Sequence, residues 1–259
     1  MRIHPPRGCW LVTVLLVISP LVFAEIAPVD IARQQQAIQS TVDVFKTGDI
    51  EAFAKKIQFP LARRYPLPPV NNAQELRQRY ADIFDPPLGK VISASNAKTD
   101  WKSVGWRGYM LARGLVWADE SGLITAINYE SSREKTLRAA LIAADRKTLH
   151  ESLRSFDEPV LKWDTPNYRL RIDAQGEHYR LALWPAGRSF QDNPELIIER
   201  GTLTFDGSGG NHHYSFPLGK KLYVCDVEVL GSDSQHHIGS LDLMLEDKPL
   251  LSEKVTRAF

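Results

Sequence analysis

Residues 106–129 read WRGYMLARGLVWADESGLITAINY, and we expect this stretch to form the last hairpin of an N-terminal domain. From Gly105 to Trp117 the side chains alternate with a period of two, which predicts a strand. Asp119 to Gly122 supplies turn chemistry, and Leu123 to Tyr129 resumes as a second strand. The segments before this hairpin are predicted to be mostly helical, and those after it mostly strands.

The first residues have the pattern of an export signal. Arg2 and Arg7 precede an apolar run from Leu11 to Phe23, and Val22-Phe23-Ala24 is a small-x-small cleavage site. The run is shorter than the about 20 residues that a membrane-spanning helix needs, and we expect no transmembrane segment elsewhere. The sequence therefore predicts cleavage near Ala24 and a periplasmic or extracellular mature chain.

The mature chain would be nearly neutral. The full sequence has 32 basic and 31 acidic residues, and losing Arg2 and Arg7 leaves 30 and 31. This balance gives no reason to expect a nucleic-acid partner. Cleavage would also remove Cys9, so that Cys225 remains as the single cysteine. One thiol cannot form an internal disulfide, and packed cores must stabilise the fold.

Residues 25–131 are predicted to form a mixed α+β domain. Apolar residues recur at helical spacing behind Asp or Asn caps, which predicts helices at Asp30–Phe45, Ile50–Ile57 and Ala73–Phe84. The proline-rich residues 59–69 are expected to be extended. Asp85-Pro86-Pro87 is read as the end of the third helix, and Val91–Lys98 as strand or loop.

This order of elements, carried by FKTGDIEAFAKKI, NNAQELRQRYADIF and GYMLARGLVW…GLITAINYE, resembles the cone-shaped α+β fold of the ketosteroid-isomerase-like (nuclear-transport-factor-2-like) superfamily. The resemblance covers residues 28–131. It implies a pocket between a curved sheet and the helices, where some members use an acidic base and many only bind ligands. Arg107, Tyr109 and Arg113 share one face of the first predicted strand and are candidate ligand-binding residues there. Asp100 and Asp119 are read as solvated turn residues.

The C-terminal half changes to strand periodicity. A helix predicted at Arg133–Phe156 connects the two domains over residues 132–157. Residues 158–259 then show seven or eight short alternating runs, which predict an antiparallel sandwich or small barrel. This half resembles, in outline, the small β-domains of exported inhibitor proteins. The expected fold class is an α+β cone-like domain joined by a helix to an all-β antiparallel domain.

The histidines of the C-terminal half raise the question of a metal site. His212, Cys225 and His236 or His237 could offer ligands, but their spacing matches no zinc signature, and Cys225 lies on an apolar strand face. A Cys225–His212 nucleophile pair lacks an orienting acid. The glycine-rich residues 206–211 lack the lysine of a phosphate loop. We therefore predict no catalytic residue, no metal and no cofactor.

These patterns predict an exported, non-catalytic binding or interaction protein of the bacterial cell envelope. The partner would be an unknown small ligand or an envelope protein. The binding surface would be the pocket of Arg107, Tyr109 and Arg113, or the loop from Asp206 to His213, where Asn211 and His213 are the candidates. Two alternatives stay open: a small-ligand hydrolase or isomerase using the cone pocket, and an immunity or inhibitor protein against an envelope-acting toxin or lysozyme-like enzyme.

Overall fold

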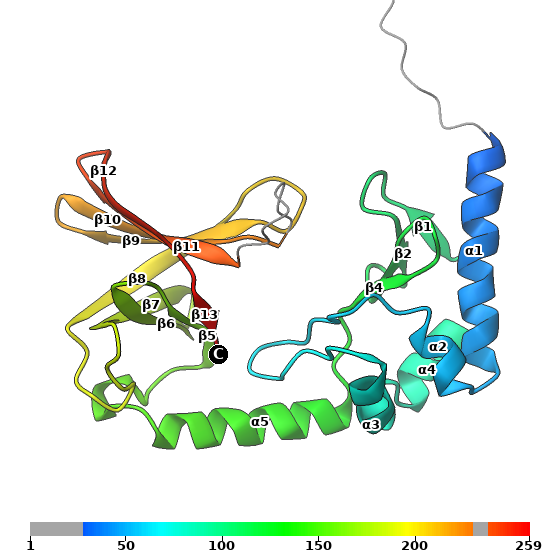
Figure 1. Ribbon diagram of the computed structural model, residues 1–259, viewed down its shortest axis with the longest axis horizontal. Helices are drawn as coiled ribbons and strands as arrows, with labels where there is room; N and C mark the ends of the chain where they lie inside the picture. The colour runs from blue at the N-terminus through cyan, green and yellow to red at the C-terminus, as the bar shows by residue number, and fades with distance from the viewer. Residues whose placement is uncertain (1–27, 230–237) are drawn as a thin grey trace, which may run out of the picture.

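A computed structural model describes residues 28–229 and 238–259 of the chain (Figure 1). The fold is mixed α+β, with helices in the N-terminal half, one small antiparallel sheet and one larger, curled antiparallel sheet. The predicted export signal lies outside the described residues. No helix of the described ranges is long and apolar enough to cross a membrane.

The N-terminal half combines short helices with a small sheet. Helices α1 to α3 lie where apolar spacing predicts them, and Asp49 and Asn72 cap α2 and α3 by accepting hydrogen bonds from backbone N–H groups of the first turn. The elements are α1 (Pro28–Lys46), α2 (Ile50–Ala54), α3 (Ala73–Ile83), α4 (Pro86–Ser93), β1 (Trp101–Ser103), β2 (Tyr109–Leu111), β3 (Val116–Ala118) and β4 (Ile124–Ile127), the strands being paired in that order.

Helix α4 begins at the residues that were expected only to end α3. The Asp85 carboxylate accepts a hydrogen bond from the Leu88 N–H at 3.2 Å, and Pro86 is the first helical residue. Proline suits this position because its missing N–H would have no partner inside the helix, and its φ is already helical. The prediction of strand or loop from Val91 onward is therefore wrong for the residues up to Ser93.

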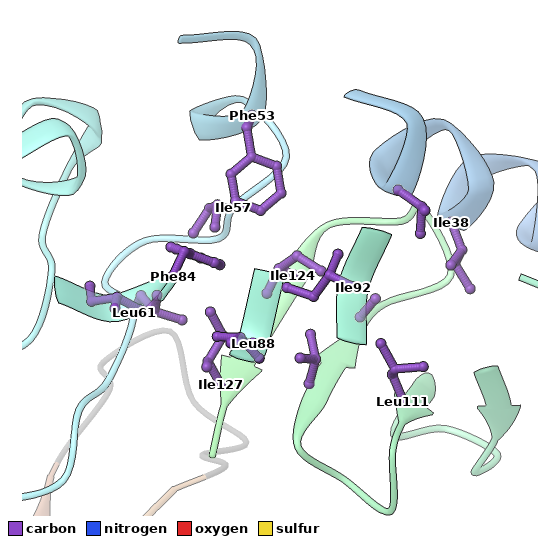
Figure 2. Packing of buried hydrophobic residues seen from close by; sticks show 14 of the residues in the cluster. Ile38, Phe53, Ile57, Leu61, Phe84, Leu88, Ile92, Leu111, Ile124 and Ile127 are labelled. Atoms are coloured by element: carbon purple, nitrogen blue, oxygen red, sulfur yellow. The ribbon is translucent and has the colours of Figure 1, made fainter. Parts of the chain in front are cut away.

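The helices pack against one face of the small sheet. Ile38 of α1, Phe53 of α2 and Leu88 of α4 belong to the same buried cluster as Leu111 and Ile124 of the sheet (Figure 2). All five side chains are buried. Burial of this apolar surface, at about 25 cal/mol per Å², is the main force holding helices to sheet.

Residues 106–129 contain three short strands, β2 to β4, where two were predicted. After Leu111 the chain turns at residues 112–114, whose φ values are 49°, 60° and 89°, and β3 begins at Val116. Strict alternation would place Val116 opposite to Tyr109, yet both are buried on the helix side of the sheet. A turn inside an alternating run shifts the register, and a shift of one residue exchanges the two faces.

Helix α5 (Ser132–Lys147) connects the two halves, and in Figure 1 it runs from α3 to a position beneath the curled sheet. The Ser131 hydroxyl caps it by accepting from the Glu134 N–H at 3.1 Å. The helix is shorter than the predicted Arg133–Phe156, because Thr148 ends it and a single 3-10 turn, η1 (Glu151–Leu153), follows. The Thr148 hydroxyl donates to the Asp145 carbonyl at 2.8 Å, a local bond with which threonine competes against helix continuation.

The C-terminal half is antiparallel, as predicted, but its strands form one curled sheet, a half-barrel, and not a sandwich or closed barrel. The strands are β5 (Glu158–Asp164), β6 (Tyr168–Gln175), β7 (His178–Pro185), β8 (Leu196–Phe205), β9 (His212–Leu218), β10 (Lys221–Val227), β11 (Gly239–Leu245), β12 (Lys248–Lys254) and β13 (Arg257–Ala258), paired in the order β12-β11-β10-β9-β8-β7-β6-β5-β13.

Irregular pairing and a glycine account for the curl. The β5–β6 and β7–β8 pairs each contain a register shift, and such bulges bend and twist a strand. Gly201 of β8 leaves room for Phe216, because a Cβ there would lie 2.2 Å from the phenyl ring. One face of the sheet carries a core that includes Phe216 and Cys225. On the other face, α5 and η1 pack against Trp184 of β7.

Candidate ligand-binding clefts

The chain from residue 60 to residue 69, here called the proline segment, reaches from the helical half toward the curled sheet (Figure 1). Its four prolines have no N–H, so regular backbone pairing cannot satisfy the carbonyls around them. Arginine side chains donate to these carbonyls instead. Arg138 Nε donates to the Tyr65 carbonyl at 2.8 Å, and Arg79 Nη1 donates to the Pro68 carbonyl at 2.8 Å. The segment is thereby held to α3 and α5.

A buried ion pair anchors the start of the same segment. Arg63 pairs with Glu134 of α5, and the two side chains are 2% and 1% exposed. Arg63 also donates to the carbonyls of Ile127 at 2.7 Å and Tyr129 at 2.6 Å. A buried ion pair persists only where such additional bonds satisfy its remaining donors. Arg63 therefore joins the proline segment, the end of β4 and α5.

The central cleft lies between the proline segment and the curled sheet and has a volume of about 710 Å³. Its walls are mostly carbon, with aromatic side chains on both sides and few polar groups, which is the usual character of a small-molecule site. The lining side chains include Tyr65, Pro66, Leu67 and Pro68 on one side and Val160, Trp163, His212, Tyr214, Val227 and Phe259 on the other.

Lys162, which lines the central cleft on the sheet side, is held in an ion pair. Lys162 pairs with Asp145, and Arg171 contacts the other oxygen of that carboxylate at 2.6 Å. Burial lowers the pKa of the Lys162 ammonium, although Asp145 opposes this effect. Burial and then the Asp145 charge raise the pKa of the Tyr65 phenol, and burial raises the pKa of Tyr214 to about 12. The cleft thus presents neutral phenols and a paired lysine, which suits a neutral or apolar ligand.

A second cavity, the tryptophan cleft, has a volume of about 700 Å³ and lies between the chain before β2 and the glycine-rich loop 206–211. Trp106 is 67% exposed at its rim. The Arg107 guanidinium lies 5.6 Å from the ring centroid of Trp117, and its Nη1 donates to the Ser208 carbonyl at 3.1 Å. The two surfaces proposed from sequence, around Arg107 and in the glycine-rich loop, therefore meet at this cleft.

The other candidates of the N-terminal half do not join Arg107 there. Tyr109 is 4% exposed within the core, and its hydroxyl donates to Gln34 Oε1 at 2.6 Å. Arg113 is exposed in the 112–114 turn. Both residues lie outside the central and tryptophan clefts. Arg107 lies in a turn that closes before β2 begins at Tyr109, where the Val104 N–H donates to the Gly108 carbonyl at 2.8 Å, and Arg113 lies in the separate 112–114 turn. These two turns interrupt the single strand on which the three residues would have shared a face.

The candidates of the C-terminal half lie at the end of the glycine-rich loop and just after it. Asn211 Oδ1 accepts a hydrogen bond from the Val229 N–H at 2.9 Å. His213 Nδ1 lies 3.0 Å from both carboxylate oxygens of Asp206. Asn211 therefore shapes the end of the loop, and His213 belongs to a polar cluster on the strands below it.

That polar cluster was not anticipated from the sequence, which gave no sign of converging reactive groups. Ser240 Oγ donates to Asp242 Oδ2 at 2.7 Å, and Asp242 neighbours Asp226, whose pKa is raised by burial and by that second carboxyl. His213 and Asp226 are directly paired across β9 and β10. The alternation of side chains in β10 predicts that Asp226 lies on the face opposite to the apolar Cys225. It does not predict that His213 lies beside Asp226, because that depends on how β9 and β10 pair.

The zinc ligands weighed from the sequence do not gather in the described residues. Cys225 is fully buried in the sheet core, and burial raises the pKa of its thiol. His212 Nδ1 lies 2.8 Å from the Gly210 carbonyl, at the rim of the central cleft. His236 and His237 lie outside the described residues.

The chain matches no protein-family model, no curated protein and no solved structure.

Proposed function

We propose that this chain is an exported, non-catalytic binding protein of the bacterial cell envelope that holds a small apolar or amphipathic ligand in the central cleft. The cleft of about 710 Å³ between the proline segment and the curled sheet carries this proposal, because its volume and apolar lining fall in the range of small-molecule sites. Export rests on the sequence of residues 1–24.

The anchoring of the proline segment supports a preformed site. Arg63 and Arg138 hold one wall by partly buried hydrogen bonds, and Arg79 adds an exposed one. A wall that is already ordered loses little conformational freedom when a ligand binds, and preorganisation of this kind raises affinity. The relation of the N-terminal half to the ketosteroid-isomerase-like superfamily is part of the proposal, and helices packed on a small antiparallel sheet support it.

The structure supports the two alternative functions to different degrees. A hydrolase or isomerase would place its ligand between the helices and the small sheet, and the buried side chains of Figure 2 that occupy this space count against it. An inhibitor of an envelope enzyme is favoured by one observation. Trp106 is 67% exposed beside Arg107, and these are the residue types that dominate protein interfaces.

The central cleft can be tested by filling it. Val227 lines the cleft, whereas Val224 lies on the opposite face of the same strand, β10. Titration of the purified chain with the apolar fluorescent probe N-phenyl-1-naphthylamine is expected to give saturable binding. Val227→Trp is expected to weaken this binding at least about tenfold, and the matched variant Val224→Trp to leave it unchanged. Equal binding by both variants would show that the ligand site lies elsewhere.

Export has its own test. Expression of the whole chain in a Gram-negative host, followed by fractionation and N-terminal sequencing, is expected to give a periplasmic product that begins at Glu25. A full-length product retained in the cytoplasm would contradict this part of the proposal without affecting the cleft.

A further inference from the structure

One face of the curled sheet carries an unbroken row of polar side chains. Direct cross-strand pairs place Thr204 beside His213, His213 beside Asp226, Asp226 beside Ser240 and Ser240 beside Lys254. This row lies opposite to the face that carries Tyr214 and Cys225 in the core, so it is separate from the central cleft.

Ligand atoms converge in the middle of this row. One atom each from Asp206, His213 and Asp226 lies within 4.8 Å of the other two. His213 Nδ1 is 3.0 Å from both oxygens of Asp206. Asp206 directly follows β8, and His213 and Asp226 lie in β9 and β10. Their convergence therefore depends on strand pairing and not on closeness in sequence.

The charges around these atoms are unbalanced. Asp242 hydrogen-bonds Asp226, which brings a third carboxyl group to the cluster. Lys254, the basic side chain at the end of the row, pairs with Glu228 at 3.4 Å. The imidazole of His213 is therefore the basic group that faces the carboxylates. Carboxylates this close repel one another unless a proton or a metal ion lies between them.

We propose that Asp206, His213 and Asp226 form a site for Zn²⁺. Zn²⁺ is bound by imidazole nitrogen and carboxylate oxygen in proteins, and an imidazole ligand favours it over the oxygen-seeking Ca²⁺ and Mg²⁺. Asp242 supplies either a further oxygen ligand or a hydrogen-bonding partner of Asp226. Ser240 Oγ, 2.7 Å from Asp242 Oδ2, holds that carboxylate in place.

A metal ion here links two strands to the glycine-rich loop. Asp206 is the first residue of this loop and His213 follows it closely, so a shared ion fixes both of its ends. The same loop lines the tryptophan cleft and accepts the hydrogen bond from Arg107 at Ser208. The site thus stabilises one wall of the tryptophan cleft, and it does not depend on what the central cleft binds.

The test is calorimetric titration of the purified, chelator-treated chain with ZnCl₂, MnCl₂, CaCl₂ and MgCl₂. We expect one Zn²⁺ per chain and weaker binding of the other three ions. The melting temperature is expected to rise by about 5 °C or more at a free Zn²⁺ concentration about 100-fold above Kd.

Three variants locate the ion. Asp226→Asn and His213→Ala are each expected to weaken Zn²⁺ binding at least about tenfold and to abolish the rise in melting temperature. Asp247→Asn, an exposed acid in the β11–β12 turn, is the matched control and should bind Zn²⁺ like the unmodified chain. Circular dichroism of the metal-free variants checks that they fold.

Three outcomes would overturn the proposal: no Zn²⁺ binding by the unmodified chain, tighter binding of Ca²⁺ or Mg²⁺ than of Zn²⁺, or Zn²⁺ binding that survives both Asp226→Asn and His213→Ala. The last result would place the ion on other histidines. Probe binding in the central cleft should be the same with and without Zn²⁺, which keeps the two proposals separately testable.

Discussion

Removal of the Glu134 carboxylate is the perturbation whose effect the structure defines best. Glu134 is 1% exposed and pairs with Arg63, while Arg79 Nη2 lies 3.8 Å from it. Glu134→Ala leaves the buried Arg63 guanidinium without a counter-charge, and removing one partner of a buried pair costs about 3–5 kcal/mol. Arg63 keeps its bonds to two backbone carbonyls, so we expect about 3 kcal/mol. For a chain of this size the melting temperature should fall by about 6–12 °C.

Urea unfolding followed by circular dichroism measures this loss, with Glu51→Ala as the control. Glu51 pairs with Arg77 at the surface, where the two side chains are 60% and 44% exposed, and such pairs contribute at most about 1 kcal/mol. Glu134→Ala should also weaken probe binding in the central cleft, because Arg63 anchors its proline wall. A loss for Glu134→Ala no larger than that for Glu51→Ala would refute the reasoning about the buried pair.

Four further outcomes are expected. Gly201→Ala should destabilise the fold by about 1–3 kcal/mol in urea unfolding, because its Cβ would meet the Phe216 ring at 2.2 Å. The pKa of Tyr214 is about 12 in the folded protein, above its ordinary value of 10.0. The contribution of the buried neutral phenol to the free energy of unfolding is therefore complete below pH 10 and is lost as pH rises through about 12. Alkaline unfolding followed by absorbance at 295 nm measures this loss. Cys225 is fully buried with a raised pKa, so a thiol reagent such as DTNB should react with it in denaturant and not in the native chain. In the presence of chelator, Asp226→Asn should raise stability at pH 7 by about 0.5 kcal/mol, because it removes a charge facing other carboxylates; a loss of stability there would contradict the charge imbalance.

Much of the local structure could be predicted from the sequence. The caps at Asp49 and Asn72 act within one helical turn, so their effect does not depend on the rest of the fold. The period of two in the C-terminal half likewise predicts antiparallel strands, since it reports which side of each strand is buried. Asp85 shows the limit of such local signals. The same residues can end one helix and begin the next, and packing of Leu88 into the core accompanies the second role.

The candidate sites depend on longer-range contacts. Arg107 and Ser208 are 101 residues apart in sequence and meet in space, and only the position of the curled sheet relative to the helical half makes this contact possible. His213 and Asp226 become neighbours through one particular strand register, which residue patterns do not specify.

The sequence by itself determined the helix caps and the alternating strands, because these follow from backbone chemistry and side-chain period within a few residues. The prediction that residues 59–69 are extended is wrong, because the chain turns at Tyr65 and Pro66 and folds back so that Leu61 pairs with Val70. The tertiary structure decided that residues 112–114 turn, that the C-terminal strands curl into a half-barrel, and that arginines from α3 and α5 hold the proline segment against a cleft. Each of these features depends on contacts between residues that are far apart in the sequence, and such contacts leave no periodic signal along the chain.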